Sequence, residues 1–199
     1  MIQNKLALIA LGANLPSAAA DVGETLRSAA RILHENRNTT ITTFSRFWKT
    51  PAMPAGSGPD FVNAALTLRT TLSAPDLLAL LHDIEARFGR DRGTGRWSAR
   101  VLDLDLIGYD DLVLPDRNIQ QDWMALSPER QKIDTPENLI LPHPRLQDRG
   151  FVLAPLAEIA PEWIHPVTGQ SVTKMLAGLP DEAIRGMTPF TALEMPVLP

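Results

Sequence analysis

Two hydrophobic periods alternate along the first half of this 199-residue sequence, and their order leaves few folds available. Short apolar runs, which favour β-strands, cover residues 5–11, 39–49, 61–70 and 101–107. Segments 22–33 and 73–88 instead repeat apolar residues every three or four positions, which predicts amphipathic helices. The order strand, helix, strand, strand, helix, strand is typical of a ferredoxin-like α+β fold. In that fold a mostly antiparallel sheet has helices packed on its faces.

Local signals mark where several of these elements begin and end. Ser73 and Asp76 form a capping box with Pro75 in the first turn, and Gly89 is a natural helix stop. In segment 61–70 one set of side chains points one way (Val62, Ala64, Leu66, Leu68) and the other set points the opposite way (Phe61, Asn63, Ala65, Thr67, Arg69).

The second half of the chain is less regular. Residues 116–137 form a polar excursion with no clear period beyond a short helical turn, 139–144 are extended and 151–159 are helical. We expect a single domain over 1–186, including the excursion, followed by a loosely held proline-rich tail at 187–199.

Composition excludes several classes of protein. The sequence contains no cysteine, which excludes disulfides and thiolate metal sites and fits a cytoplasmic protein. The net charge of −4 argues against a general binder of nucleic acid. There is no secretory signal and no apolar run of about 18 residues, so we expect no membrane partner. We expect a monomer or a dimer.

The strongest chemical signal is the pair Asp103 and Asp105 within a strand of alternating leucines. Residues two apart on a strand share a face, with Cα atoms about 6.6 Å apart at roughly 3.3 Å per residue. Two carboxylates this close repel each other and suit a hard cation such as Mg²⁺ between them. A solvated strand face would show the same pattern.

A basic loop precedes this strand. It carries a local charge of +3 from four arginines and Asp91, together with two glycines and an indole (Arg90, Arg92, Arg96, Arg100, Gly93, Gly95, Trp97). Arginine forks match phosphate oxygens, so the loop and the aspartates together predict a polyphosphate and metal site. The alternative is a solvated charge run.

Other groups could converge on this site. His82 and Glu85 are three residues apart on the polar side of the second predicted helix, and His143 lies between two prolines, near Arg145 and Arg149. Asn63 shares a strand face with Phe61, an arrangement that suits a planar heterocycle, and Phe151 could supply a second ring. Each of these residues could equally be structural: the phenylalanines in the core, and His82 and Glu85 on the surface.

These motifs together resemble those of the 6-hydroxymethyl-7,8-dihydropterin pyrophosphokinases of the folate pathway. The shared segments run from Leu6 to Pro166 and are Leu-Gly-Ala-Asn-Leu (11–15), Lys-Thr-Pro (49–51), Asp-Phe-Val-Asn-Ala-Ala (60–65), Ile-Glu (84–85), Gly-Arg-Asp-Arg (89–92), Arg-Trp (96–97), Arg-Val-Leu-Asp-Leu-Asp-Leu-Ile (100–107), Leu-Pro-His-Pro-Arg (141–145) and Arg-Gly-Phe-Val-Leu-Ala-Pro-Leu-Ala-Glu-Ile-Ala-Pro (149–161). Such enzymes transfer pyrophosphate from ATP to the hydroxymethyl group of the pterin and release AMP.

The resemblance implies a role for each candidate residue. Asp103 and Asp105 would bind two Mg²⁺ ions and act in catalysis with Arg90 and Arg92. The nucleotide and its triphosphate would contact a larger set (His82, Glu85, Arg92, Arg96, Trp97, Arg100, Leu106, Ile140, His143, Arg149). The pterin pocket would comprise Thr50, Pro51, Met53, Phe61, Asn63 and Phe151.

Some positions depart from the family pattern. The usual serine of the first turn is Ala13, and a tyrosine that meets the pterin is Phe61. His82, Asn138 and Pro144 stand where the family often has glutamine, arginine and tyrosine. These departures affect details of nucleotide and pterin contact and leave the two aspartates in place.

Two other functions fit parts of the sequence. A ferredoxin-like RNA-binding module could use the basic loop 90–100, although two aspartates on the sheet and the negative charge oppose this. The chain could also be part of a larger folate enzyme.

Overall fold

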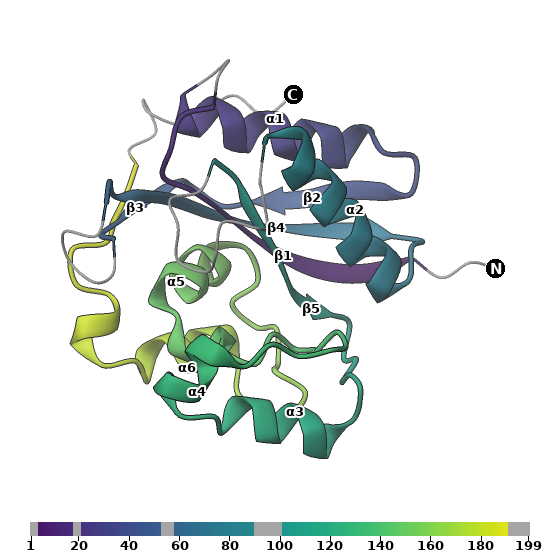
Figure 1. Ribbon diagram of the computed structural model, residues 1–199, viewed down its shortest axis with the longest axis vertical. Coiled ribbons are helices and arrows are strands. Elements are labelled where there is room, and N and C mark those ends of the chain that lie inside the picture. Colours follow the sequence, from purple (N-terminus) through teal and green to yellow (C-terminus); the bar gives the residue numbers. More distant parts are fainter. Residues whose placement is uncertain (1–3, 18–20, 53–57, 90–100, 191–199) are drawn as a thin grey trace.

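The predicted order of the first six elements is present in the computed structural model, which describes residues 4–17, 21–52, 58–89 and 101–190, and one predicted strand is divided so that seven elements result. They are β1 (Lys5–Ala13), α1 (Val22–Glu35), β2 (Thr39–Phe44), β3 (Trp48–Thr50), β4 (Phe61–Thr70), α2 (Ala74–Arg87) and β5 (Asp103–Tyr109) (Figure 1).

The strand predicted over 39–49 is divided into β2 and β3. Both pieces pair with β4, and Ser45 at the break bonds to Ala65 of β4. The Ser45 amide donates to the Ala65 carbonyl, and the Ala65 amide donates to Ser45 Oγ. A side chain replaces one backbone acceptor, so the ladder is interrupted while its hydrogen bonds stay satisfied.

The sheet is antiparallel in the order β5-β1-β4-β3-β6, and β2 also pairs with β4. This arrangement confirms the ferredoxin-like α+β prediction. The register of β1 with β5 shifts by one residue, because Leu8 faces Gly108 whereas Ile9 faces Leu106. Ile107 is therefore an extra residue in β5, a β-bulge.

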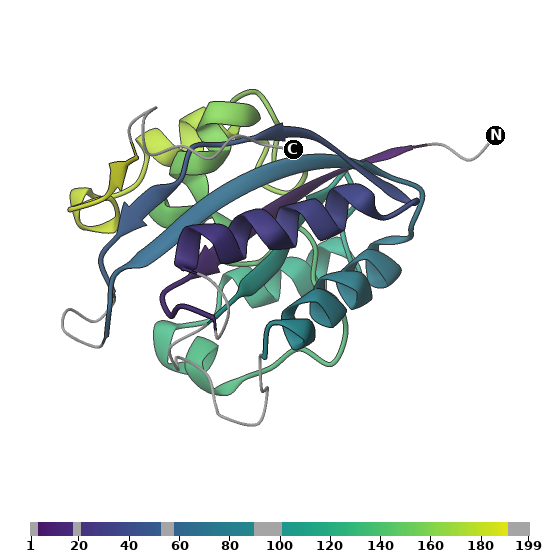
Figure 2. The same ribbon diagram turned by 90° about the horizontal axis from the view of Figure 1, so that it is seen from above.

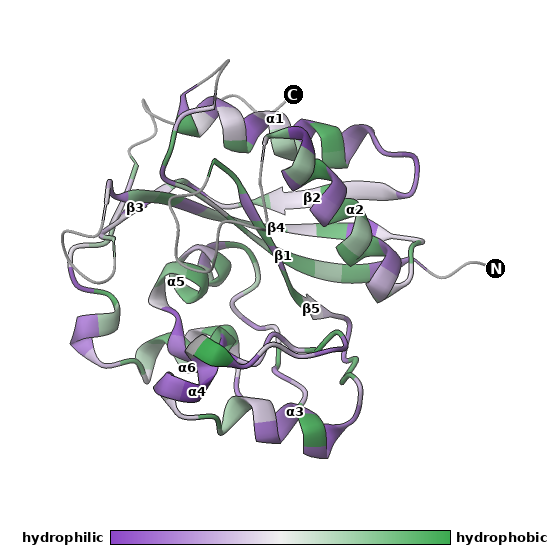
Figure 3. Cartoon of the chain, in the orientation of Figure 1, coloured by the Kyte–Doolittle hydropathy of each residue, from purple (hydrophilic) through white to green (hydrophobic). Residues whose placement is uncertain are grey.

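Helices cover both faces of the sheet (Figures 1 and 2). α1 and α2 pack on one face, where they bury the larger core, and their N-terminal amides are capped by the side chains of Asp21 and Ser73. α5 (Gly150–Ile159) and α6 (Val172–Ala177) pack on the other face against a second core that includes Ala65 and Ile107. The central strands therefore contribute apolar residues to both cores, and Figure 3 shows hydrophobic residues along β1 and β5. On the face that carries the aspartates, α5 packs against β4.

The predicted excursion contains more helix than expected. It holds α3 (Arg117–Met124) and α4 (Pro128–Ile133), capped by Asp116 and Ser127. Segments of eight and six residues are too short to display a clear hydrophobic period, which is why the sequence pattern did not reveal them. A single bridge between Leu114 and Leu141 closes the base of the excursion, so 139–144 is extended without forming a longer strand.

Part of the predicted tail is held against the sheet. Thr188–Pro189 forms β6, which pairs with β3, and the Phe190 amide donates to the Phe47 carbonyl at 2.8 Å. Before β6, Asp181–Ala183 forms a short 3-10 turn, and Leu146–Asp148 forms another ahead of α5. Residues 191–199 lie outside the described ranges. None of the helices in the described ranges has the length and apolarity needed to cross a bilayer.

Candidate active site

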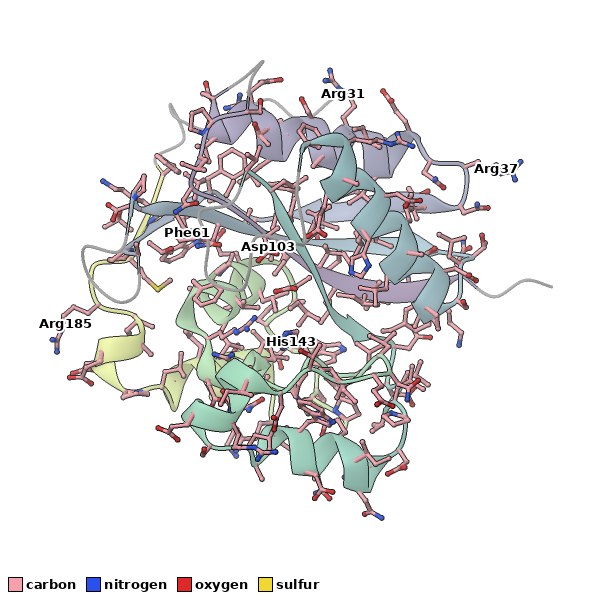
Figure 4. The ribbon with its side chains drawn as sticks, viewed as in Figure 1. Arg31, Arg37, Phe61, Asp103, His143 and Arg185 are labelled. Atoms are coloured by element: carbon pink, nitrogen blue, oxygen red, sulfur yellow. The ribbon has the colours of Figure 1, made fainter. Side chains whose placement is uncertain are left out.

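The register of three neighbouring strands brings the predicted metal and pterin residues to one face of the sheet. Gly12 of β1 lies opposite Asn63 of β4 on one side and opposite Asp103 of β5 on the other. Ala10 lies likewise opposite Ala65 and Asp105. Directly opposed residues share a face, and Ala10 and Ala65 belong to the core beneath α5. Both aspartates and Asn63 therefore project toward the α5 side, where Figure 4 labels Phe61, Asp103 and His143.

The alternation predicted for β5 is confirmed. Leu102, Leu104 and Leu106 are buried in the core beneath α1 and α2, whereas Asp103 and Asp105 are partly exposed. Leu106, which the resemblance placed beside the nucleotide, is itself a core residue and only 3% exposed. The apolar face fixes the strand, so the carboxylates are held on a rigid element.

Glu85 has a different position from the one expected. We expected Glu85 on the polar side of α2, but its side chain is buried, with 1% exposed. Its Oε1 accepts a hydrogen bond of 2.8 Å from the Leu104 amide. β5 is the last strand on its side of the sheet, so among the described residues no strand lies beyond it to accept this amide. Glu85 thus holds the backbone between the two aspartates. No local sequence signal indicates that β5 is an edge strand whose backbone amide needs a side-chain acceptor. His82 of the same helix is half-buried.

Arg149 connects the aspartates to His143. Its Nη1 donates to Asp105 Oδ2 at 3.3 Å and lies 3.5 Å from His143 Nε2. Arg149 immediately precedes α5, and its guanidinium also lies 5.6 Å from the Phe151 ring centre. One arginine therefore contacts a predicted metal ligand, a predicted phosphate ligand and a predicted pterin residue.

The His143 ring is held in one orientation and one tautomer. Its backbone amide donates to the Ile107 carbonyl at 2.9 Å, and its Nδ1 accepts from the Arg145 amide at 3.1 Å. Burial and the positive charges of Arg149 and Arg145 lower the pKa of His143 well below its ordinary 6.5. The neutral ring then carries its proton on Nε2. Two donors, this N–H and the Arg149 guanidinium, meet beside Asp105, which is a favourable place for an anion oxygen.

The predicted pterin residues form a second group on the same face. Asn63 Nδ2 donates to Thr50 Oγ1 at 2.7 Å, and both residues are buried. Asn63 Oδ1 points toward Gly12, where an added Cβ would lie only 2.7 Å from it. Phe61 is half-buried and opposite Thr50. Phe151 is 39% exposed at the start of α5, so the structure does not bury it in the core.

The remaining predicted residues divide between described and undescribed parts of the chain. Pro51 is half-buried directly after β3, and Ile140 is 6% exposed near the base of the excursion. Six others lie outside the described residues (Met53, Arg90, Arg92, Arg96, Trp97, Arg100). Sequence reasoning did not assign roles to Gly12, which makes room for the Asn63 amide, or to Asn14, which donates to the Pro59 carbonyl at 3.2 Å.

A divalent ion would find a limited set of protein ligands here. Within the described ranges, no group of three or more histidine, aspartate or glutamate side chains could hold a metal ion. Asp103 and Asp105 offer hard carboxylate oxygens on one strand face, which suits Mg²⁺ completed by phosphate oxygens and water.

Comparison with known proteins gives a consistent family. A family model described as 7,8-dihydro-6-hydroxymethylpterin-pyrophosphokinase matches residues 8–161. Proteins named 2-amino-4-hydroxy-6-hydroxymethyldihydropteridine pyrophosphokinase are 39% identical to the chain in Synechocystis, 36% in Bacillus subtilis and 31% in Haemophilus influenzae. The alignments cover 66%, 78% and 92% of this chain, and 56%, 78% and 98% of those proteins.

A solved structure supports the fold. A crystal structure of wild-type Plasmodium falciparum HPPK-DHPS aligns with 88% of this chain at a TM-score of 0.63 and 14% identity. The aligned region is 41% of that longer chain.

Proposed function

The chain belongs to the 7,8-dihydro-6-hydroxymethylpterin-pyrophosphokinase family, and from this membership and the site we propose its reaction. The enzyme transfers pyrophosphate from ATP to the hydroxymethyl oxygen of 6-hydroxymethyl-7,8-dihydropterin, in folate biosynthesis. The oxygen attacks the β-phosphorus, the bond from that phosphorus to the bridging oxygen of the α-phosphate breaks, and AMP leaves. The hydroxyl proton is released.

The observation that carries this proposal is the common sheet face of the Asp103–Asp105 pair and the Asn63–Thr50 pair. One pair offers carboxylates beside a guanidinium, which suits a metal-bound phosphate chain. The other offers a fixed amide, which suits the donor and acceptor edge of a pterin. The strands β4, β1 and β5 keep these pairs in register, so the two substrates would meet on a rigid surface.

On the phosphate side the protein's task is to neutralise and orient charge. Arg149 and the His143 Nε2–H would donate to phosphate oxygens. Because His143 is neutral with its proton on Nε2, it acts as a donor and not as a base. Asp103 and Asp105 would hold two Mg²⁺ ions, which neutralise the triphosphate when bound.

The basic segment is expected to complete the phosphate site. Arg90, Arg92, Arg96, Arg100 and Trp97 would contact the nucleotide, together with His82, Glu85 and Ile140. Glu85 accepts the Leu104 amide, so its contribution to nucleotide binding would come through its hold on β5.

On the pterin side Asn63 would bond to the heterocycle's edge, with Phe61 and Phe151 against its ring faces and Thr50, Pro51 and Met53 around them. The Thr50 hydroxyl fixes the Asn63 amide through its donated hydrogen bond, so the amide is oriented before substrate arrives. No observation supports the alternative of an RNA-binding module.

The test is the identity of the nucleotide product. The protein is mixed with Mg²⁺, ATP and reduced 6-hydroxymethylpterin, and the products are separated by anion exchange. We expect AMP and the pterin diphosphate in equal amounts. ADP as the product, or no pterin-dependent AMP, would refute the proposed reaction.

A further inference from the structure

The C-terminal segment Leu179–Phe190 lies beyond the residues that match the family model, yet it contacts two elements of the candidate site. We propose that this segment, here called the C-terminal strap, positions the pterin side of the active site. The inference rests on the proposed function, because the substrate whose site it adjusts is the pterin.

The first contact is with the start of α5. Gly150 is buried between Arg149 and Phe151, and an added Cβ there would lie 2.3 Å from the Ala183 carbonyl oxygen and 2.9 Å from Ile184 Cγ2. The strap backbone therefore rests directly on the helix turn that presents Arg149 and Phe151. Only a glycine permits this approach.

The second contact is with the entry to the loop after β3. Gly186 has a φ of +75°, and an added Cβ would lie 3.0 Å from Pro51 Cγ. Pro51 directly follows Thr50, whose hydroxyl orients Asn63. The same short strap thus touches both sides of the predicted pterin pocket, the β3 side and the α5 side.

The strap is anchored at its far end. β6 pairs with β3 through Thr188 opposite Lys49 and Pro189 opposite Trp48. The Phe190 ring then packs edge-on against Phe47 with centroids 6.4 Å apart, at the margin of the larger core. Figures 1 and 4 show this segment at one side of the sheet, with Arg185 pointing away from the fold. An anchored segment that bridges β3 and α5 fixes the distance between them. Because the predicted pterin pocket is built from both elements, the strap also sets the width of that pocket.

The decisive variant is Gly186→Ala, with Gly169→Ala as its matched control. Both glycines have a left-handed φ, +75° and +70°, so alanine costs similar backbone strain at either site. At Gly169 an added Cβ meets nothing within 4 Å, whereas at Gly186 it presses on Pro51. The difference between the two variants therefore isolates the contact with Pro51.

We expect Gly186→Ala to raise the KM for the pterin about tenfold relative to Gly169→Ala, because small misplacements of substrate-holding groups have effects of this order or larger. The KM for ATP should be the same in both variants. A simple loss of stability would lower the amount of active enzyme without separating the two KM values. Identical pterin KM values would overturn the proposal.

A second measurement does not depend on turnover. Since the sequence has no cysteine, Arg185→Cys supplies a unique thiol on the exposed part of the strap, and Lys174→Cys supplies one on α6. With an environment-sensitive dye on each, we expect 6-hydroxymethylpterin to shift the emission at 185 and not at 174. No shift at 185 would count against the strap.

If the unmodified enzyme forms AMP but the Gly186→Ala and Gly169→Ala variants behave alike, only the strap proposal fails. If it forms no AMP, the proposed function fails and the strap proposal fails with it.

Discussion

Replacing Gly12 by alanine should damage the pterin side of the site through a single predictable collision. The new Cβ would lie 2.7 Å from Asn63 Oδ1, so the amide must withdraw by about 0.7 Å to reach ordinary contact at 3.4 Å. Asn63 is buried, and its other amide atom is committed to Thr50 Oγ1 at 2.7 Å. The substitution therefore either breaks that hydrogen bond or spreads β1 and β4.

The magnitude follows from known costs of such changes. Overpacking a core position costs about 1–3 kcal/mol, and a lost buried hydrogen bond costs about 1 kcal/mol. Alanine recovers about 0.5–1 kcal/mol relative to glycine in a strand. We expect a net loss of about 2 kcal/mol, which in a chain of this size lowers the thermal midpoint by about 4–8 °C.

The assay combines calorimetry with steady-state kinetics on Gly12→Ala and on Gly23→Ala. Gly23 lies in α1, where an added Cβ meets its nearest atoms at 3.4 Å, so that control should be neutral or stabilising. Gly12→Ala should raise the KM for the pterin and leave the KM for ATP unchanged. In an Asn63→Ala background the collision disappears, so Gly12→Ala should then cost little stability. An equal cost in both backgrounds would refute the reasoning.

Three further predictions concern other parts of the molecule. Asp103→Ala or Asp105→Ala should reduce AMP formation by a factor on the order of 10²–10³. The circular dichroism spectrum should not change, because both side chains lie outside the cores. Near-normal turnover would contradict the metal assignment. Burial lowers the pKa of His165 from 6.5 to about 4. As the pH drops, this histidine is therefore protonated in the unfolded chain before it is protonated in the folded one. The free energy of unfolding should fall between about pH 6.5 and about pH 4. His165→Gln should flatten that dependence in urea titrations, and an unchanged slope would exclude this histidine as its source. Ser73→Ala removes the side-chain cap of α2 and should cost about 1 kcal/mol without altering either KM, as checked by thermal melts.

The parts of the fold that could be predicted are those determined by local pattern. The alternation at Leu104 and Asp105 and the cap at Ser73 each depend on neighbours within a few residues. The common face of Phe61 and Asn63 follows from strand geometry alone.

The parts that could not be predicted depend on distant neighbours. Glu85 is buried because α2 lies along the outer edge of β5, a fact of tertiary packing. β6 is only two residues long and includes a proline, so no alternation marks it; its pairing with β3 and the Phe47–Phe190 contact hold it. The sequence likewise indicated that Arg149 lies near His143. It did not predict that the Arg149 guanidinium contacts both Asp105 and Phe151.

The bulge at Ile107 has a consequence for how this strand tolerates changes in length. The extra residue shifts the phase of β5, so that Asp105 faces α5 while Tyr109 belongs to the core on the opposite side. An insertion or deletion after Ile107 can be absorbed by enlarging or removing this bulge, and the carboxylates keep their direction. A one-residue insertion or deletion between Leu102 and Asp105 has no bulge nearby to absorb it. It would reverse the faces of the residues on one side of the change, so that an aspartate points into the core under α2 or a leucine points to the aspartate face.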